Sequence, residues 1–429
     1  MNAPAYLPKT ISFELNGETV VAFEGETIIE AAKRHGVEIP HLCYSESLRP
    51  DGNCRSCMVE IDGERVLAPS CCRSPKADMK VSSVSPRAIA SQKMVLELLL
   101  SDMPDRAYKP DNELNYWAEK MRARQPRFAP RLSPGPDLSN TAIAVNLDAC
   151  IQCTRCVRAC REEQVNDVIG YAFRGRHSEI VFDMGDPMGD STCVTCGECV
   201  QACPTGALAP AKNAAMVVPD KTVDSVCPYC GVGCQLTYHV KDNRIVEVVG
   251  RDGPANHGRL CVKGRYGFDY PNHRHRLTKP LIRRSDVPKS EHFVMDPADP
   301  LSAFREATWD EALDFAAEGF KKIIREKGKY ALAGFGSAKG SNEEAYLFQK
   351  LVRTGFGTNN VDHCTRLCHA SSVVALLEGV GSGAVSNPVA DVQYSEVIVI
   401  IGANPIVNHP VAATFVKNAV KQGAKLILI

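Results

Sequence analysis

The sequence shows no excess of charge of either sign and no long apolar run. Lysine and arginine together number 50, as do aspartate and glutamate, so the charge balance gives no argument for nucleic acid or an anionic membrane surface as a partner. No apolar stretch approaches the roughly 20 residues of a membrane-spanning helix. The N-terminal residues lack the charged and then apolar pattern of a secretory signal. We therefore expect a cytoplasmic protein that binds neither nucleic acid nor membrane.

Cysteine, in contrast, is abundant, with 19 residues in a chain of 429. The cytoplasm keeps thiols reduced, so these residues are not expected to form a disulfide framework. Metal ligation is the alternative, and the spacing of the cysteines accounts for nearly all of them. The length suggests about three domains, and a hydrophobic content of 44% is enough for packed cores.

The densest pattern lies between residues 150 and 203. Two runs of Cys-x2-Cys-x2-Cys-x3-Cys are separated by thirty-two residues, and Pro204 follows the second run. This repeat is typical of ferredoxins with two [4Fe-4S] clusters, in which the fourth cysteine of each run ligates the other cluster. The first predicted ligand set is Cys150, Cys153, Cys156 and Cys203, and the second is Cys193, Cys196, Cys199 and Cys160. Paired zinc sites are the alternative, but zinc needs only two Cys-x2-Cys pairs, so the full repeat favours iron–sulfur clusters.

The N-terminal residues predict a small β-rich domain. Apolar alternation on either side of Asn16-Gly17 predicts a hairpin over residues 10–23. A capping box at residues 27–30 then predicts the start of a helix, which Gly36 ends.

A cysteine-rich loop follows this helix. Its spacing, Cys-x10-Cys-x2-Cys-x13-Cys, gives the four predicted ligands of one [2Fe-2S] cluster, which are Cys43, Cys54, Cys57 and Cys71. Cys72 could replace Cys71 as the fourth ligand, but the x13 spacing favours Cys71, which leaves Cys72 as a small buried thiol. Together with the hairpin and helix, the loop resembles the β-grasp [2Fe-2S] ferredoxin domain of the large complex I iron–sulfur subunit. Related hydrogenase and formate dehydrogenase subunits share that domain.

Residues 85–101 predict a helix with Ser85 as its N-cap and Pro86 in its first turn. In complex I relatives, a cluster with one histidine and three cysteine ligands follows such a helix. Residues 102–140 contain neither residue type, so that cluster is not expected here. Four prolines between residues 126 and 136 indicate a stiff linker.

A further four-cysteine set follows the tandem repeat. Its spacing, Cys-x2-Cys-x3-Cys-x26-Cys, predicts a third [4Fe-4S] cluster held by Cys227, Cys230, Cys234 and Cys261. The segments CPYCGVGCQL and GRLCVKGRYG, which contain these residues, resemble the N-terminal [4Fe-4S] domain of molybdopterin oxidoreductases. In that family a lysine just after the last cysteine lies between the cluster and the pterin, which implies this role for Lys263.

From residue 308 onward the pattern alternates between helix and strand. Helices are expected over 308–327, from Asn342 and near 410–422, with strands at 330–336, 396–402 and 424–429. Such alternation predicts a doubly wound parallel sheet, whose ligands bind beyond the carboxyl ends of the strands. Glycine-rich turns fall at two of those ends and could present backbone N–H groups to phosphate.

The segment GTNNVDHCTRLCHASSV resembles the active-site segment of molybdenum and tungsten formate dehydrogenases. There a cysteine or selenocysteine binds the metal and histidine follows it, which implies these roles for Cys368 and His369. Nitrate reductases of the family typically have methionine after the ligand, so His369 disfavours that activity. Cys364, four residues before Cys368, has no role in the resemblance and is expected to be a packed thiol. Residues 340–351 and 401–413 resemble the same subfamily. The pterin contacts that this resemblance implies are Gly340, Asn342, Gly402, Asn404, Pro405 and His409.

All of these features together resemble the catalytic α subunit of soluble NAD-dependent formate dehydrogenase. The resemblance implies one [2Fe-2S] cluster, three [4Fe-4S] clusters and a bis-molybdopterin guanine dinucleotide with molybdenum or tungsten. Formate would be the substrate, and because the chain shows no nucleotide-binding fingerprint, a flavin- and NAD-binding iron–sulfur partner subunit is expected. The sequence ends at Ile429 within an expected strand, so the pterin domain is expected to be incomplete.

The alternative is a non-catalytic electron-transfer subunit similar to those of complex I or hydrogenases, with a degenerate pterin domain. A degenerate domain need not keep Cys368 and His369, so these two residues favour catalysis. The expected fold is multidomain, α+β and α/β. Its domains are a β-grasp [2Fe-2S] domain (1–84), a helical segment and linker (85–140), a two-cluster ferredoxin-like domain (141–220), a [4Fe-4S] molybdopterin oxidoreductase domain (221–280) and the start of the pterin-binding α/β domain (281–429).

Overall fold

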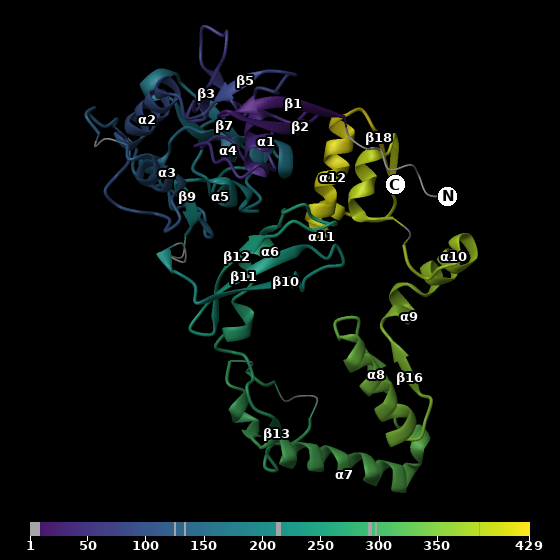
Figure 1. Ribbon diagram of the computed structural model, residues 1–429. Helices are drawn as coiled ribbons and strands as arrows, with labels where there is room; N and C mark the ends of the chain where they lie inside the picture. The colour runs from purple at the N-terminus through teal and green to yellow at the C-terminus, as the bar shows by residue number, and fades with distance from the viewer. Residues whose placement is uncertain are drawn as a thin grey trace. The chain divides into compact units, whose positions relative to one another are not determined.

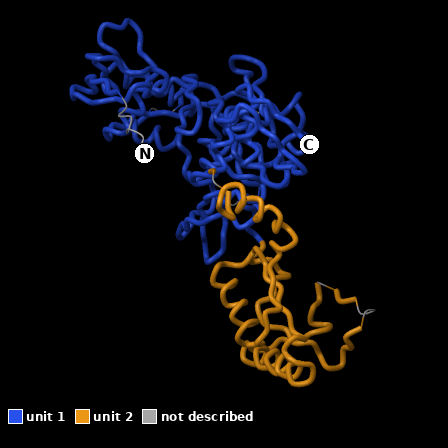
Figure 2. Tube along the Cα trace, turned by 90° about the vertical axis from the view of Figure 1, so that its right-hand side faces the viewer, with its two compact units in different colours: residues 1–269, 388–429 blue, residues 270–387 orange. Residues whose placement is uncertain are grey.

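The computed structural model describes residues 9–123, 126–132, 134–211, 216–290, 294–296, 298–385 and 387–429. The chain divides into two compact units, shown in Figure 2, and each is described by itself. The first contains residues 1–269 and 388–429, and the second contains residues 270–387. No helix in the described part of the chain combines the length and the apolar character needed to cross a bilayer.

A five-stranded mixed sheet forms the N-terminal domain, with the strand order β2-β1-β5-β3-β4. Its strands are β1 (Thr10–Leu15), β2 (Glu18–Phe23), β3 (Met58–Ile61), β4 (Ala68–Pro69) and β5 (Lys80–Ser82). The predicted hairpin is confirmed, because β1 and β2 pair antiparallel around Asn16 and Gly17, which both have positive φ. Helix α1 (Ile28–Arg34) begins at the predicted capping box, where Glu30 accepts a hydrogen bond from the Thr27 N–H at 2.8 Å. This arrangement is the expected β-grasp domain.

Helices α2 (Pro86–Leu100) and α3 (Glu113–Met121) connect this domain to the next. The Ser85 side chain caps α2 as predicted and accepts from the Ala88 N–H at 3.2 Å. Leu96 of α2 and Trp117 of α3 share a buried cluster with side chains of both flanking cysteine-rich domains. The two helices therefore join the first two cluster domains through a common core.

The ferredoxin-like domain is built from short elements around its cysteines. These are β6 (Ile143–Val145), α4 (Arg155–Arg158), β7 (Ile169–Ala172), β8 (Glu179–Phe182), α5 (Glu198–Ala202) and β9 (Leu208–Pro210). Strands β6 and β9 pair antiparallel, and so do β7 and β8. Four cysteines take part in the hydrophobic core, so the predicted ligands themselves form part of the interior of this domain.

A three-stranded antiparallel sheet follows, with β11 in its centre and helix α6 beside it (Figure 1). Its elements are β10 (Lys221–Val226), β11 (Gln235–Lys241), β12 (Arg244–Gly250) and α6 (Val262–Tyr266). In the turn between β11 and β12, Asp242 and Asn243 both have positive φ. Hairpin turns of this kind need such backbone angles.

The C-terminal residues return to the first unit. They form β17 (Val397–Ile400), α11 (Pro405–Asn408), α12 (Pro410–Lys421) and β18 (Lys425–Leu428). Strands β17 and β18 pair in parallel. Val411 and Phe415 of α12 are buried in the same core as the Cys227 set, so this helix packs on the cluster domain rather than standing apart.

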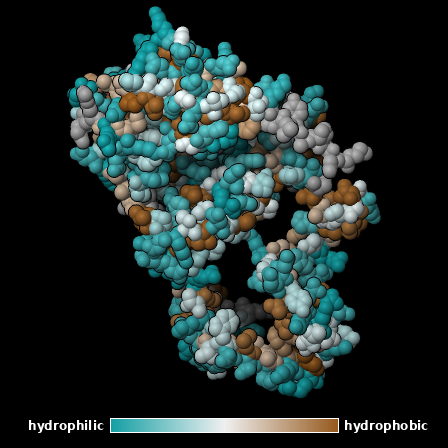
Figure 3. Space-filling view, in the orientation of Figure 1, coloured by the Kyte–Doolittle hydropathy of each residue, from teal (hydrophilic) through white to brown (hydrophobic). Residues whose placement is uncertain are grey.

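The second unit covers residues 270–387. Its elements are β13 (Leu281–Arg283), β14 (Phe304–Glu306), α7 (Trp309–Lys327), β15 (Gly334–Gly336), α8 (Asn342–Lys350), β16 (Val361–His363), α9 (Thr365–Cys368) and α10 (Ala370–Val380). Strands β15 and β16 pair in parallel, in a sheet separate from that of β17 and β18, and β16 was not among the expected strands. Apolar side chains of α10 lie on the surface in Figure 3, where Val374, Leu377 and Val380 are each more than half exposed.

The strand expected at 330–336 is shorter than predicted and covers only β15. The Asn360 side-chain amide donates to the carbonyls of Tyr330 and Leu332, both at 3.2 Å, and occupies acceptors that a strand would use. Short 3-10 or π turns complete the described elements, at η1 (Leu147–Ala149), η2 (Ala159–Glu163), η3 (Gly175–His177), η5 (Tyr270–Asn272), η6 (Pro300–Ser302), η7 (Lys329–Ala331), η8 (Leu351–Gly355) and η9 (Val389–Tyr394).

Candidate metal centres

The [2Fe-2S] ligand candidates meet at one end of the β-grasp sheet. Cys43, Cys57 and Cys71 are buried, and Cys54 is half-buried. Hydrogen bonds with Cys54 and Cys71 hold the pKa of the Cys43 thiol well below its usual range. A hydrogen bond with Cys71 lowers the pKa of Cys57 to about 7. Four thiols close enough to share protons are also close enough to share a small cluster once deprotonated, so this donor set fits the group.

Cys72 lies outside that set. Its side chain is exposed, and its sulfur is 3.6 Å from that of Cys71. A Cβ atom at Gly52 would lie 2.7 Å from the Cys72 sulfur, so the thiol packs against a position where a side chain would clash with it. The expectation of a small buried thiol at Cys72 is therefore wrong. This placement favours Cys71 as the fourth ligand, which stays a prediction.

In the ferredoxin-like domain, the fourth cysteine of each run faces the other run. Burial is the main cause that raises the pKa of Cys150, Cys153 and Cys156, and negative charge on Cys203 adds to it. The first predicted ligand set therefore gathers in one place. This proximity supports the crossover of Cys203 that the repeat predicts, which stays a prediction.

The second set behaves in the same way. Burial again dominates the raised pKa of Cys193, Cys196 and Cys199, and charge on Cys160 adds to each. Thiols in so apolar a setting ionise only where nearby positive charge stabilises the thiolates, and cluster iron supplies that charge. The chemistry of both sets therefore fits [4Fe-4S] clusters.

Both ferredoxin loops repeat an unusual backbone conformation. The residues just before and after the middle cysteine have positive φ, at Gln152 and Thr154 in the first loop and at Thr195 and Gly197 in the second. Residues in the left-handed region curve the loop and turn backbone N–H groups toward its centre, where an anionic group could bind. Thr195 N–H accordingly donates to the Cys193 sulfur at 3.3 Å. Sequence reasoning missed this feature, because only Gly197 signals it by residue type.

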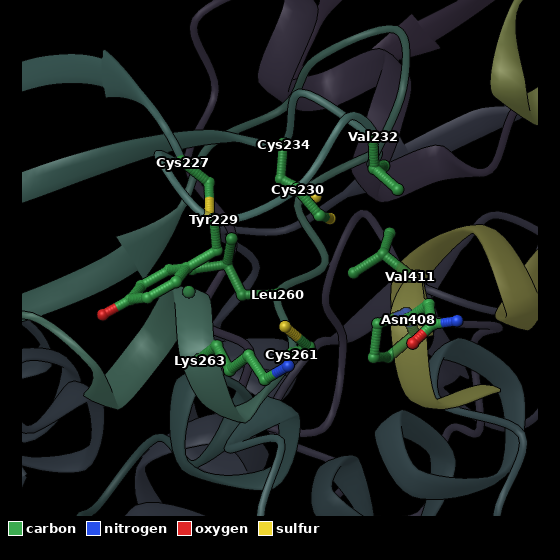
Figure 4. Close-up of a pocket in the computed structure, with 12 residues that line it drawn as sticks. Cys227, Tyr229, Cys230, Val232, Cys234, Leu260, Cys261, Lys263, Asn408 and Val411 are labelled. Atoms are coloured by element: carbon green, nitrogen blue, oxygen red, sulfur yellow. The ribbon is translucent and has the colours of Figure 1, made fainter. Parts of the chain in front are cut away.

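The Cys227 set surrounds a cavity of about 130 Å³ (Figure 4). The lining comprises Cys227, Tyr229, Cys230, Val232, Cys234, Leu260, Cys261, Lys263, Gly264, Asn408, Pro410 and Val411. Burial raises the pKa of Cys234 to about 12, and the other three thiols add to the shift. Gly264 forms part of the wall, and a Cβ atom there would make an ordinary contact with the Cys227 sulfur at 3.5 Å. Four thiols around one cavity fit a cubane cluster.

Two arginines join neighbouring ligand sets. Arg158, from the first ferredoxin run, donates to the Cys43 carbonyl at 2.5 Å and to the Cys153 carbonyl at 3.4 Å. Arg265, four residues after Cys261, donates to the Cys196 carbonyl at 2.8 Å. These contacts place the four sets in one sequence, from the Cys227 set through the two ferredoxin sets to the [2Fe-2S] set.

Arg265 also makes a buried ion pair with Glu198 at 2.8 Å, in which the two side chains are 4% and 7% exposed. Glu198 accepts in addition from the Leu260 N–H at 2.7 Å. A Cβ atom at Gly197 would lie 2.1 Å from Arg265 Cδ, so only glycine leaves room for this crossing. The pair therefore fixes the domain of the Cys227 set onto the ferredoxin-like domain.

One buried polar atom near the second ferredoxin set has no protein partner. Among the described residues, the Tyr266 hydroxyl is buried without a hydrogen bond. Its pKa is raised, mainly by burial, with Cys199 and Cys196 as nearby negative charges. A hydroxyl without a protein partner beside the predicted ligand thiols fits a cluster, because cluster sulfurs accept hydrogen bonds.

No three His, Cys, Asp or Glu side chains in the described residues are grouped as a single metal ion would need.

The predicted pterin and metal residues fall in both units. Lys263 is exposed at the edge of the Cys227 cavity, and Gly402, Asn404, Pro405 and His409 lie around α11 in the same unit. Gly340, Asn342, Cys368 and His369 belong to the second unit. Their convergence on one cofactor stays a prediction.

Cys368 ends α9, and His369 separates α9 from α10 with a φ of −137°. Both side chains are exposed, and the His369 N–H donates to the Thr365 carbonyl at 2.8 Å. An accessible thiol at a helix junction is a soft donor that suits a metal such as molybdenum or tungsten. Cys364, expected to be a packed thiol, is exposed as well, so that expectation is wrong.

Comparison with known proteins gives each region a counterpart. Residues 8–86 match a 2Fe-2S iron-sulfur cluster binding domain, and residues 149–207 match a 4Fe-4S dicluster domain. Residues 220–273 match the molybdopterin oxidoreductase Fe4S4 domain, and residues 276–429 match the molybdopterin oxidoreductase family.

Two curated relatives carry the name "Putative formate dehydrogenase". One, from Staphylococcus haemolyticus, is 32% identical over 95% of this chain and 44% of its own length. The other, from Staphylococcus aureus, is 31% identical over the same shares. The chain thus spans less than half the length of these relatives. A solved NAD+-reducing nickel–iron hydrogenase matches 49% of this chain and 90% of its own, with 26% identity and a TM-score of 0.45.

Proposed function

We propose that this chain, a molybdopterin oxidoreductase with additional [2Fe-2S] and [4Fe-4S] domains, oxidises formate to carbon dioxide. The observation that carries the proposal is the continuous series of four cysteine sets, which ends beside Lys263. The pair Cys368-His369 and the similarity to proteins named as formate dehydrogenases support formate as the substrate. Electrons would leave at the [2Fe-2S] end to a flavin- and NAD-binding partner subunit.

The residues have separate tasks in this scheme. When bound, a bis-molybdopterin guanine dinucleotide with molybdenum or tungsten would supply two-electron oxidation, and the clusters would supply one-electron carriers. Cys368 would hold the metal through its thiolate. His369 would orient formate or take up the released proton, because imidazole exchanges protons near neutral pH. Lys263, on α6 at the edge of the Cys227 cavity, would bind the pterin on the side that faces the cluster.

The protein would keep the electron path dry and ordered. Most of the thiols are buried, which excludes water from the sulfur atoms. Arg158 and Arg265 tie neighbouring ligand sets together through backbone carbonyls of ligand cysteines. Such bridges hold the sets at fixed separations, which is what the protein contributes when a cofactor carries the chemistry.

The test is a pair of variants in the full-length, metal-loaded protein. Cys368→Ser replaces a soft ligand by a harder one and should reduce formate oxidation by roughly two orders of magnitude or more. The four cluster EPR signals should remain, because no cluster set contains Cys368. His369→Ala should retain the metal but lower the rate and flatten its pH profile.

Two outcomes would contradict the proposal. Normal formate turnover in Cys368→Ser would exclude this residue as the metal ligand. Absence of pterin and of molybdenum or tungsten from the natively purified protein would favour the alternative, an electron-transfer subunit without catalysis. Matched iron content in wild type and variants controls for loss of folding.

A further inference from the structure

Helix α12 reaches two predicted cluster sites at once. Its first turn, with Pro410 and Val411, lines the cavity of the Cys227 set. Two turns later Lys417 lies beside the second ferredoxin set. Thr414 accepts from Arg259 at 3.1 Å between these points, and Phe415 is buried under the same guanidinium, 4.5 Å from its ring centroid. The helix is therefore held firmly along this path.

The Lys417 ammonium is fixed at the wall of the second ferredoxin site. It donates to the Gln164 carbonyl at 2.8 Å and to Asn166 Oδ1 at 3.1 Å. Gln164 and Asn166 line a small cavity together with four predicted ligands, which are Cys160, Cys193, Cys196 and Cys199. Both hydrogen-bond partners of the ammonium are neutral groups, so its charge remains available to the site.

The electrostatics agree with this placement. Burial lowers the pKa of Lys417, and negative charge on Cys196 and Cys160 opposes that shift. Lys417 in turn acts to lower the pKa of Cys160, against the larger effect of burial. The lysine and the two thiols thus lie within range of one another in a half-buried setting, where screening by solvent is weak.

We propose that Lys417 raises the reduction potential of the [4Fe-4S] cluster held by Cys193, Cys196, Cys199 and Cys160. The reduced cluster carries one more negative charge than the oxidised one, so a fixed cation nearby stabilises the reduced form. Taking up one electron at this cluster then becomes easier relative to its neighbours. This cluster would therefore preferentially hold the electron that it receives from the cluster of the Cys227 set.

The experiment is a redox titration of the full-length, cluster-loaded protein, followed by EPR. Lys417→Met removes the charge and keeps most of the apolar stem. The equilibrium constant for one-electron reduction of this cluster should fall roughly tenfold, a shift of about 59 mV to more negative potential. Lys417→Arg, which keeps the charge, should shift it much less. The measurement does not use formate, so it stands apart from the test of the proposed activity.

Lys421 provides a matched control on the same helix. It is exposed and pairs with Asp167 at 2.9 Å, so Lys421→Met should shift the potential of this cluster much less than Lys417→Met does. An unchanged potential in Lys417→Met, with the cluster EPR signal intact, would overturn the proposal. If Lys417→Met fails to assemble the cluster, Lys417→Gln is titrated in its place. Loss of the cluster in both neutral variants but not in Lys417→Arg would make Lys417 an assembly residue and also overturn the proposal.

Discussion

The ion pair between Arg265 and Glu198 provides a quantitative test of how the cluster domains are joined. Replacing Arg265 by methionine removes the donor to the Cys196 carbonyl and to Glu198. Glu198 would stay in the interface with only the Leu260 N–H as a hydrogen-bond partner from the other domain. The carboxylate is 7% exposed, so water does not replace the lost cation.

The magnitude follows from that burial. Removing one partner of a buried ion pair costs about 3–5 kcal/mol, because an uncompensated charge remains in a poorly solvated place. Removing both charges costs much less, since the remaining groups pack without a desolvation penalty. Arg265→Met combined with Glu198→Gln should therefore recover most of the loss. The glutamine can still accept from the Leu260 N–H.

The Leu260 amide is a local reporter of this interface. Hydrogen exchange measures the free energy of local opening, and each 1.4 kcal/mol changes protection about tenfold. In the anaerobically purified, cluster-loaded protein, Arg265→Met should reduce protection of the peptide around residue 260 by roughly 100-fold or more. The double variant should return it close to wild type.

Lys241 and Asp220 form an exposed ion pair in the same domain and serve as the control. Lys241→Met should leave protection around residue 260 unchanged, since exposed pairs contribute little. Unchanged protection in Arg265→Met, with iron content intact, would refute the reasoning. So would a double variant that is no more protected than the single one.

Two further predictions concern the clusters. Four complete ligand sets predict one two-iron cluster and three four-iron clusters, about 14 iron atoms per chain. Cys72→Ala should not lower that iron content. Zinc in place of iron, or a fifth cluster, would contradict the ligand assignment. Cys54→Ser should remove the [2Fe-2S] signal and abolish NAD reduction by the complete complex, while a small dye still accepts electrons from the remaining clusters. Equal loss of both activities would contradict an exit at the N-terminal domain.

The sequence predicted those parts of the molecule that depend on neighbours along the chain. The hairpin at Asn16-Gly17 and the N-cap of α2 are confirmed, because turn and cap preferences act over three or four residues. The cysteine spacing predicted four ligand sets, and the assignment of ligands within them, including the crossover of Cys203, stays a prediction. Cluster ligation needs loops of defined length, so spacing carries that information directly.

Residues that act across domains were not predictable in this way. Arg265 and Glu198 are 67 positions apart, and Lys417 and Gln164 are 253 apart. Lysine and arginine are common on helix surfaces, so nothing in their local pattern marks them as buried partners. Cys364 is a further example: its burial was expected from the residue type alone, and its thiol is exposed.

The cations that the sequence did not reveal share one arrangement. Arg158, Arg265 and Lys417 each come from one part of the first unit and reach the ligand loops of another, at the Cys43 carbonyl, the Cys196 carbonyl and the wall of the second ferredoxin site. Buried thiolates are costly unless positive charge lies nearby, and a shared cation lowers that cost while fixing the distance between neighbouring sites. The chain has a formal net charge of +0, so this arrangement leaves no trace in the overall balance. The relay would thus be joined by charges placed at its internal boundaries, and the overall composition carries no information about them.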